Sequence, residues 1–213
     1  MEKIDLKKFE KEYYKKNITL IAGVDEAGRG PLVGPVVAAA VILPKDYSLE
    51  GLNDSKQLSE KKRNIFFECI KKDAISYGIG IVPANVIDEI NIYEASRLAM
   101  NIALDNLSVK PEFILTDAMP LPTRDNVLSI VHGDALSLSI AAASVLAKVT
   151  RDSLMYELDL QHPEYGFKHH KGYPTKMHLE NIKKYGILDN YRFSYRPVKE
   201  IVESRRHEEV TKL

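Results

Sequence analysis

The sequence predicts an α/β fold in which a mixed β-sheet is flanked by helices and followed by a helical C-terminal region. Strand-like apolar runs alternate with helical stretches along the chain, which is the pattern of layered α/β domains. Only a turn rich in Gly and Pro separates the first two strand-like runs, so we expect an antiparallel pair and therefore a mixed sheet. The chain has 213 residues, 45% of them hydrophobic and 28% charged. With no repeat or linker to divide it, we expect residues 1–213 to form one domain.

Three strands and one helix are predicted in the first part of the chain. Residues 19–24 (TLIAGV) and 36–43 are short apolar runs bounded by turn residues, as buried strands usually are. Ser59 followed by an acid is typical of a helix N-terminus, and apolar residues follow it at helical spacing. Residues 74–82 (AISYGIGIV) predict the third strand.

The rest of the chain predicts more helix than strand. Asn91 and Glu94 have the spacing of a capping box, so we expect a helix to begin there. Residues 135–160 contain many small residues and no Gly or Pro, which predicts a long helix packed closely against its neighbours. Further strands are predicted at residues 112–116 and 127–131, and further helices at residues 175–185 and 198–209.

Charge is distributed unevenly along the chain, although 30 Lys and Arg balance 30 Asp and Glu overall. Residues 161–213 carry 11 Lys and Arg against seven Asp and Glu, with five of the six His and five of the 11 Tyr. Cations interleaved with aromatic rings suit a polyanion such as nucleic acid. We therefore expect residues 161–213 to be a basic, Tyr- and His-rich region that binds substrate.

Cysteine content and hydropathy predict the compartment. The lone cysteine, Cys69, excludes an internal disulfide and a thiolate zinc site, which is typical of a cytoplasmic protein. The N-terminus is charged throughout, and no apolar run approaches the ~18–20 residues that a membrane span needs. We therefore expect neither a signal peptide nor a transmembrane helix.

Four acidic residues stand where predicted strands or loops end: Asp25, Glu26, Asp117 and Asp134. If these ends lie side by side in one sheet, the carboxylates converge and need cations between them to stay ionised. Oxygen ligands favour Mg²⁺ or Mn²⁺, and a pair of such ions serves phosphoryl transfer. Simpler roles stay open, with Asp134 as a helix N-cap and Asp117 as a turn residue. Neighbours on a strand, such as Asp25 and Glu26, share a site only where the strand geometry breaks.

The turn after these first two acids, within DEAGRGPLVGP, is a second candidate feature. It lacks the Lys-Ser/Thr ending of a phosphate-binding loop and the glycine spacing of a dinucleotide fold. Gly28 and Gly30 flank Arg29, so backbone groups can approach a ligand closely while the guanidinium offers a phosphate contact. A tight β-turn without a ligand is the plainer interpretation.

Five stretches of the sequence carry a wider pattern: GVDEAGRGPLVGPVVAAAVILP (23–44), DSKQLSEKKR (54–63), ILTDAMPLP (114–122), HGDALSLSIAAASVLAKVTRD (132–152) and HPEYGFKHHKGYPTKMH (162–178). In order and spacing they resemble the ribonuclease HII family, over roughly residues 19–198. The resemblance implies a ribonuclease H-like fold and metal-dependent hydrolysis of the RNA strand in RNA–DNA hybrids. It also implies incision 5′ to a single ribonucleotide embedded in duplex DNA, as in ribonucleotide excision repair. We expect a monomer that uses two Mg²⁺ or Mn²⁺ ions.

The resemblance also implies a role for individual residues. The family's catalytic, metal-binding acids fall on Asp25, Glu26, Asp117 and Asp134. Its substrate-binding positions fall on Gly28, Arg29 and Gly30, which contact the 2′-hydroxyl, on Tyr173, which recognises the RNA–DNA junction, and on Lys56 and Lys148, which are candidates for phosphate contacts.

Other interpretations stay open. Another ribonuclease H-like nuclease, such as a junction resolvase or an integrase core, would share the acids but lack the turn and the late tyrosine. A non-catalytic hybrid-binding module would lack an acid, and none is missing here. Fewer than 20 residues precede the first predicted strand, so the extra N-terminal domain of ribonuclease HIII is not expected. We expect Asp152 to pair with Arg151 or to cap a local turn rather than to bind metal.

Overall fold

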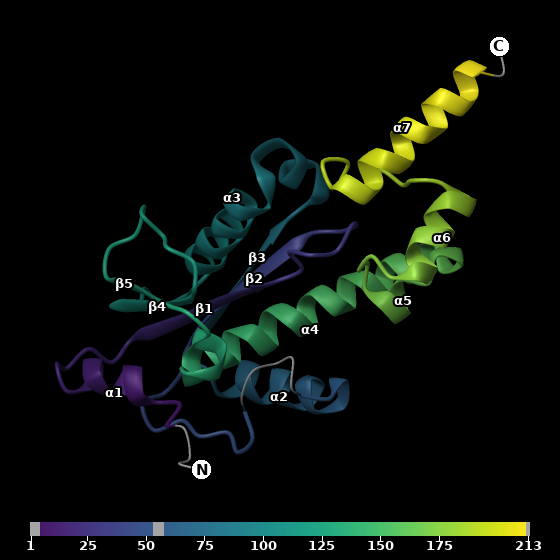
Figure 1. Ribbon diagram of the computed structural model, residues 1–213. Coiled ribbons are helices and arrows are strands. Elements are labelled where there is room, and N and C mark those ends of the chain that lie inside the picture. Colours follow the sequence, from purple (N-terminus) through teal and green to yellow (C-terminus); the bar gives the residue numbers. More distant parts are fainter. Residues whose placement is uncertain (1–4, 53–57, 212–213) are drawn as a thin grey trace.

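A five-stranded mixed sheet lies between two helical layers (Figure 1). The structure is a computed structural model, and it describes residues 5–52 and 58–211. The strands are β1 (Ile21–Ala27), β2 (Val36–Ile42), β3 (Ser76–Val82), β4 (Phe113–Asp117) and β5 (Val127–Ile130). The helices are α1 (Lys8–Tyr14), α2 (Glu60–Asp73), α3 (Ala84–Asp105), α4 (Leu138–Gln161), α5 (Phe167–His170), α6 (Lys176–Tyr185) and α7 (Arg196–Thr211), with 3₁₀ turns η2 (Gly133–Ala135) and η3 (Pro163–Tyr165).

The strand order β3-β2-β1-β4-β5 places β1 at the centre of the sheet. β1 pairs antiparallel with β2, and β2 pairs antiparallel with β3, so the predicted hairpin-like pair is confirmed. β4 runs parallel to β1, with Val24 opposite Thr116, and β5 runs parallel to β4. Since parallel strands end at the same edge of a sheet, the carboxyl ends of β1 and β4 meet.

The helices cover the two faces of the sheet unequally. α3 packs over one face, against alternate residues of β1 and β2 such as Val24 and Ala38. α4 and α2 cover the other face, where Ala39 and Ala142 belong to the same buried cluster (Figure 1). Gly23 lets α4 approach β1 closely, because a Cβ atom there would lie 2.1 Å from the backbone carbon of Ser139. The close approach predicted for the long helix is therefore confirmed.

α4 begins later than the sequence predicts. Ser137 is its N-cap, and its Oγ accepts a hydrogen bond from the Ile140 amide at 3.2 Å. Asp134 lies one turn earlier, in η2, so the alternative role as the cap of the long helix is wrong. The buried Glu10 of α1 completes this end, because Ser137 Oγ donates to Glu10 Oε1 at 2.6 Å. α1 thus closes the start of α4 through a pair of groups that are far apart in sequence.

The start of α3 also departs from the prediction. Asn91 has φ 69° and ψ 165°, which interrupts the helix, yet residues 84–90 before it are already helical. Its side chain nevertheless acts as a cap, with Oδ1 accepting from the amides of Tyr93 and Glu94 at 2.9 and 3.1 Å. The predicted capping position is confirmed, and the predicted first residue of the helix is wrong.

The C-terminal region packs against the loop between β1 and β2. Val33 forms an isolated antiparallel bridge with Tyr191, and both belong to a buried cluster that contains Phe167 and Tyr165. The helix predicted at 175–185 is confirmed, with Thr175 Oγ1 capping it through the His178 amide. α7 leaves this cluster and extends away from the sheet (Figure 1).

Over the described ranges, no helix is both long enough and apolar enough to cross a bilayer.

Candidate active site: carboxylates beside a glycine-rich turn

Three of the four predicted acids come together at the carboxyl edge of the sheet. Asp25 lies near the end of β1, Asp117 ends β4, and Asp134 lies in η2, which follows β5. One carboxylate oxygen from each lies within 4.8 Å of the others. The parallel pairing of β1 with β4 therefore produces the convergence expected from the sequence.

Local backbone geometry fixes Asp117 relative to Asp134. The amide of Gly133 donates a hydrogen bond of 2.7 Å to Asp117 Oδ1. Ala118, which follows the strand, has φ 48°, and His132 before the η2 turn has φ 57°. Both are left-handed conformations that cost energy for residues with a Cβ, and they turn the chain sharply on each side of the cluster. Asp117 is therefore more than the turn residue of the simpler interpretation, because it ends β4 and binds the Gly133 amide.

Asp25 is a buried acid of the cluster, with 5% of its surface exposed. Its Oδ1 accepts the amide of Glu26 at 2.7 Å, and the Ser144 hydroxyl also hydrogen-bonds to this carboxyl. Burial, and then the like charges of Glu26 and Asp117, raise the pKa of Asp25 well above its usual value. A cation bound nearby would stabilise the ionised form of this carboxyl group.

Glu26 borders the three-carboxylate cluster. Its Oε1 lies 3.5 Å from Arg29 Nη1, while its Oε2 is buried and has no hydrogen-bond partner among the described residues. Burial raises the pKa of Glu26, Arg29 opposes this, and the negative charge of Asp117 adds to the rise. The side chains of Asp25 and Glu26 thus both feel the charge of Asp117, although neighbours on a regular strand would point to opposite faces.

The donor set suits a hard divalent cation. All of the converging ligands are carboxylate oxygens, two of the residues are buried, and the unpartnered Glu26 Oε2 adds one more oxygen at the border. Mutual repulsion in a buried site is relieved when a cation binds, and oxygen ligands are those that hard divalent ions prefer. The residues present therefore fit a divalent-metal site.

The glycine-rich turn lies directly beside the acids. A cavity of about 330 Å³ is lined by Asp25, Asp117, Lys148 and Tyr173 as well as by residues 28–30. Tyr173 is 43% exposed, and its ring lies over Gly30, where an added Cβ would be 3.3 Å from Cε1. The structure thus brings the turn predicted at one end of the chain to the tyrosine predicted at the other.

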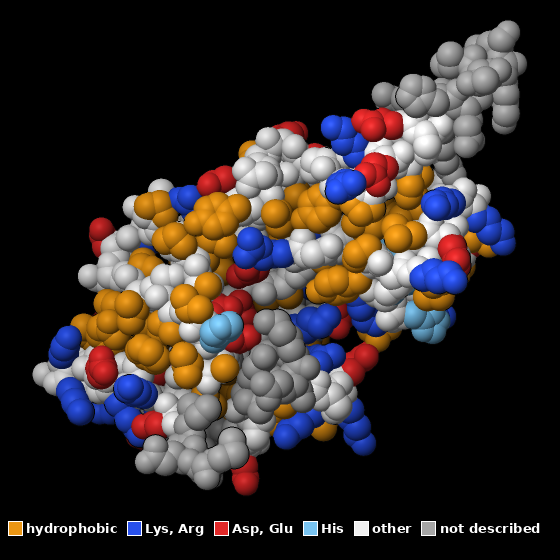
Figure 2. Space-filling view, viewed as in Figure 1, with side chains coloured by type: hydrophobic (Ala, Val, Ile, Leu, Met, Phe, Trp, Pro, Cys, Tyr) orange, Lys and Arg blue, Asp and Glu red, His pale blue; other side chains and the backbone are white. Residues whose placement is uncertain are grey.

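Two predicted lysines have different outcomes. Lys148 lines the cavity, and its Nζ is paired with Asp152 Oδ1 at 2.6 Å. The expectation that Asp152 pairs with Arg151 is therefore wrong, because Asp152 lies one helical turn after Lys148 on the same face of α4. Lys56 lies outside the described residues, so its role stays a prediction. Figure 2 shows acidic side chains near the middle of one face, with Lys and Arg side chains on both sides and over α5 and α6.

Three further residues at this site were not predicted from the sequence. Ser144 precedes Lys148 by four residues, so this spacing in an apolar helix was an available signal that both face the cavity. Arg151 and Arg192 are buried beneath the loop that carries the glycine-rich turn, where Arg151 binds the Val33 carbonyl and Arg192 binds the Gly28 carbonyl. No local pattern reveals such partners, because backbone carbonyls have no signature in the sequence.

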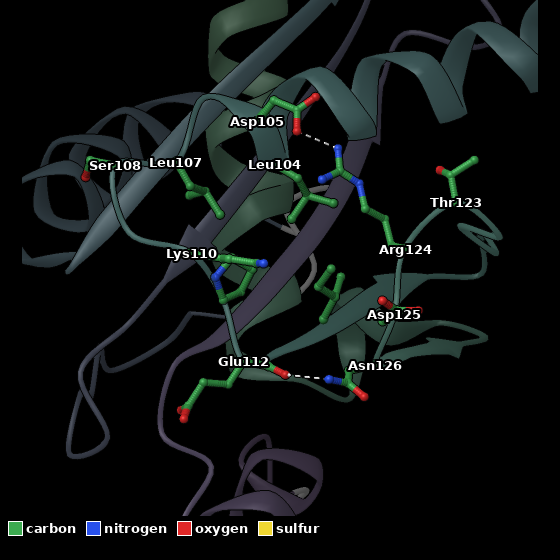
Figure 3. Close-up of a pocket in the computed structure, with 12 residues that line it drawn as sticks. Leu104, Asp105, Leu107, Ser108, Lys110, Glu112, Thr123, Arg124, Asp125 and Asn126 are labelled. Carbon is green, nitrogen blue, oxygen red and sulfur yellow. Dashed lines mark hydrogen bonds and ion pairs between the residues drawn. The ribbon is translucent and has the colours of Figure 1, made fainter.

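A second pocket, of about 650 Å³, lies where β4 begins, at the opposite edge of the sheet from the acids (Figure 3). Its charged groups are largely engaged with one another. Arg124 Nη2 donates to Asp105 Oδ1 at 2.7 Å, and Asn126 Nδ2 donates to the Glu112 carbonyl at 3.3 Å. No set of three metal-ligating side chains was found there among the described residues. We therefore place the chemistry in the smaller, acidic cavity.

Comparison with known proteins identifies relatives of this chain. The family model described as ribonuclease HII matches residues 22–198. The ribonuclease HII of Bacillus mycoides (strain KBAB4) is 54% identical over 200 residues, covering 94% of this chain and 78% of that protein. The crystal structure of ribonuclease H2 from Pyrococcus horikoshii OT3 has a TM-score of 0.75 at 29% identity, covering 87% of this chain and 98% of that one.

A further solved structure has the same fold and a named partner. It is the PCNA complex of ribonuclease HII from Archaeoglobus fulgidus, with a TM-score of 0.69 at 27% identity, covering 85% of this chain and 96% of that one. The ribonuclease H-like fold and the endoribonuclease function are thus confirmed, and the junction resolvase, integrase and non-catalytic alternatives are not favoured. This chain belongs to the ribonuclease HII family, whose members are divalent-metal-dependent endoribonucleases that act on RNA–DNA hybrids.

Proposed function

We propose that this chain cuts the RNA strand of RNA–DNA hybrids and also nicks duplex DNA on the 5′ side of a single embedded ribonucleotide, leaving 5′-phosphate and 3′-hydroxyl ends. The observation that carries the proposal is the meeting of three carboxylates, within 4.8 Å, beside the glycine-rich turn of residues 28–30. Acids alone fit many phosphodiester reactions. The turn adds backbone groups that can bind a 2′-hydroxyl, the group that distinguishes ribose from deoxyribose.

Asp25, Glu26, Asp117 and Asp134 are proposed to hold two divalent ions, Mg²⁺ or Mn²⁺. When bound, such ions supply a nucleophilic water at neutral pH and stabilise charge on the phosphoryl group and the leaving oxygen. The chain itself orients the ligands. The amide of Gly133 holds the Asp117 carboxylate, and Ser144 together with the Glu26 amide holds that of Asp25. Fixed carboxylates reduce the reorganisation that the reaction requires.

Substrate contacts are proposed for residues around the cavity. Arg29 is 48% exposed, and among the described residues its guanidinium makes a single, long ion pair with Glu26, so it can turn to a phosphate. The half-exposed Tyr173 ring offers a flat face to a sugar beside Gly30. Lys148 can exchange its pairing with Asp152 for a phosphate oxygen. We also propose a phosphate contact for Lys56, on the resemblance alone.

We further propose that residues 161–213 are the duplex-binding region of one domain. The excess of 11 Lys and Arg over seven acids supports this assignment, as does the packing of these residues against the loop that carries the turn. We also propose that the protein is a cytoplasmic monomer that takes part in ribonucleotide excision repair. The free Cys69 supports the cytoplasmic location. Light scattering after gel filtration tests the monomer.

The proposed activity is tested with an end-labelled DNA duplex that contains one ribonucleotide, incubated with Mg²⁺, Mn²⁺ or EDTA. We expect one nick 5′ to the ribonucleotide in the presence of either metal and none in EDTA. Extension of the upstream product by a DNA polymerase checks the 3′-hydroxyl end. An all-DNA duplex of the same sequence is the control, and it should stay intact. Failure to nick the ribonucleotide duplex in either metal would refute the proposal.

A further inference from the structure

Arg192 is a fully buried arginine that binds the backbone of the glycine-rich turn. Its Nη2 donates to the Gly28 carbonyl at 2.7 Å, and its Nη1 donates to the Arg29 carbonyl at 2.9 Å. Its Nε donates to the Gly34 carbonyl at 3.0 Å. Tyr195 supports the same contact, because its hydroxyl donates to the Arg29 carbonyl at 2.5 Å and accepts from Arg192.

Arg151 of α4 holds the other end of the same segment. It is 1% exposed, and its guanidinium donates to the carbonyls of Val33 and Pro35 at 3.2 and 3.3 Å. A third bond, of 3.0 Å, goes to the carbonyl of Lys171, two residues before Tyr173. Gly28 has φ 95°, and a Cβ there would lie 2.0 Å from Arg151 Nε, so the glycine and the arginine fit each other.

Neither guanidinium has a carboxylate partner within the described part of the chain; backbone carbonyls and one phenol accept its hydrogen bonds. Burial, and then the positive charge of Arg192, lower the pKa of Arg151 to about 10. Two buried, like-charged groups are expensive to fold, and hydrophobic residues of similar volume often pack at lower cost. Their presence is explained if the carbonyl directions themselves matter.

The direction of the carbonyls determines which groups of the turn face the cavity. All described peptide bonds are trans, so each carbonyl points opposite to the N–H of the same peptide unit. With the Gly28 and Arg29 carbonyls turned inward to Arg192, the amides of Arg29 and Gly30 point away from it. Neither amide donates a hydrogen bond to any described residue.

We propose that Arg192 and Arg151 are positioning residues for ribose recognition, which fix the turn with its carbonyls inward and two amide donors outward. The two donors, next to the Tyr173 ring, suit an oxygen acceptor such as a 2′-hydroxyl, and the buried positive charges strengthen them. Without the bidentate guanidinium, the turn can rotate its peptide units and present carbonyls instead. This inference rests on the proposed function, because it names what sets the selectivity of that same site.

The test compares binding of two labelled duplexes in EDTA, one with a single ribonucleotide and one entirely of DNA. Arg192→Lys keeps the charge but loses the planar fork. We expect the preference for the ribonucleotide duplex to fall about tenfold, as when one good hydrogen bond is lost, with all-DNA affinity within about twofold. Arg124→Lys is the matched control, because Arg124 binds Asp105 and the Asn101 carbonyl at the opposite edge of the sheet from the acids. That variant should keep the full preference.

A purely structural role predicts a different result. If Arg192→Lys weakens binding of both duplexes equally, or lowers the melting temperature without changing the preference, the inference is wrong. Should this variant fail to fold, Tyr195→Phe decides, because it removes only the hydroxyl that bridges Arg192 and the Arg29 carbonyl. A reduced preference in Tyr195→Phe supports the inference, and an unchanged one overturns it. A wild-type protein that shows no preference and no nicking contradicts the proposed function instead.

Discussion

The amide of Gly133 donates a 2.7 Å hydrogen bond to the carboxylate of Asp117, so the turn that carries one acid also orients another. A Cβ at Gly133 would lie 2.6 Å from Ile140 Cδ1 of α4, which leaves little room for other residues there. The acidic cluster is thus built from the sheet edge and from the start of α4 together. Its geometry depends on the packing of both layers.

Replacement of Asp25 or Asp134 by Asn should reduce cleavage by at least about 10²-fold, because the charge that holds a cation is lost while the shape is kept. Duplex binding should persist. Asp25→Asn should also raise the melting temperature in EDTA, because the uncharged side chain relieves burial and repulsion from Glu26 and Asp117. Single-turnover cleavage, anisotropy and thermal denaturation measure the three effects.

The exposed Asp125 supplies the matched control for these substitutions. Asp125→Asn should change neither turnover nor the melting temperature. Normal turnover in both Asp25→Asn and Asp134→Asn would remove these residues from the catalytic site.

Tyr173→Ala should reduce the preference for a ribonucleotide junction about tenfold, because the ring beside Gly30 loses its contact with the sugar. Tyr173→Phe keeps the ring, so its preference for the junction should fall less than that of Tyr173→Ala. Rates on a single-ribonucleotide duplex and on a continuous hybrid, measured for all three proteins, give the comparison. Equal preference in wild type and Tyr173→Ala would contradict the assigned contact.

Duplex binding should weaken as salt rises, since phosphate contacts release counterions. Lys148→Gln should weaken binding to all duplexes alike and reduce the slope of log affinity against log salt by about one. Lys110→Gln is the control, because Lys110 lines the pocket at the opposite edge of the sheet. Anisotropy titrations at several salt concentrations measure both. A salt-independent affinity is incompatible with the proposed interface.

Gly23→Ala should destabilise the fold by about 1–3 kcal/mol, because the new methyl group would overlap the Ser139 backbone, 2.1 Å away. Gly30→Ala should leave stability close to wild type, since its nearest neighbour is the edge of the Tyr173 ring at 3.3 Å. Urea denaturation compares the two. Equal stability of both variants would show that α4 and β1 can separate without cost.

Stability should fall as the pH decreases from about 6.5 to about 4. Burial lowers the pKa of His178 from its usual 6.5 to about 4. Both ring nitrogens of the folded protein are already engaged, with the Tyr173 carbonyl and the Tyr191 hydroxyl, so a further proton would disturb one of these bonds. The unfolded chain therefore binds more protons in this window, which removes up to about 3 kcal/mol. Burial lowers the pKa of the stacked His170 too, in the same direction.

Urea denaturation between pH 4 and 7 measures this loss. His178→Gln should flatten the profile, whereas His169→Gln, at an exposed position, should not. A profile that stays equally steep in His178→Gln would assign the loss to other groups.

Much of the sheet could be predicted because its strands contain short apolar runs that are followed by an acid at or near the strand end, as β1 is by Asp25 and β4 by Asp117. Helix starts could be predicted where a side chain caps locally, as Ser59 does through the Lys62 amide and Thr175 does through that of His178. The start of α4 could not, because its Ser137 cap depends on Glu10, which arrives from α1.

The candidate site divides in the same way. The acids and the turn were recognisable from local motifs and from the family resemblance. The supporting arginines, Arg151 and Arg192, were not, since the carbonyls that they bind between Gly28 and Pro35 are more than 100 positions away in the chain. Every residue has a backbone carbonyl, so a tertiary contact to one produces no local sequence pattern.

The central position of β1 has a consequence for synthesis. Asp25 lies in β1, which pairs with β2 on one side and with β4 on the other and is covered by α4. Both β4 and α4 are translated long after the β1–β2 hairpin. A chain still growing on the ribosome can therefore pair β1 with β2, but it cannot gather its three carboxylates until Asp134 has emerged. The acidic site can therefore form only after most of the chain has been synthesised.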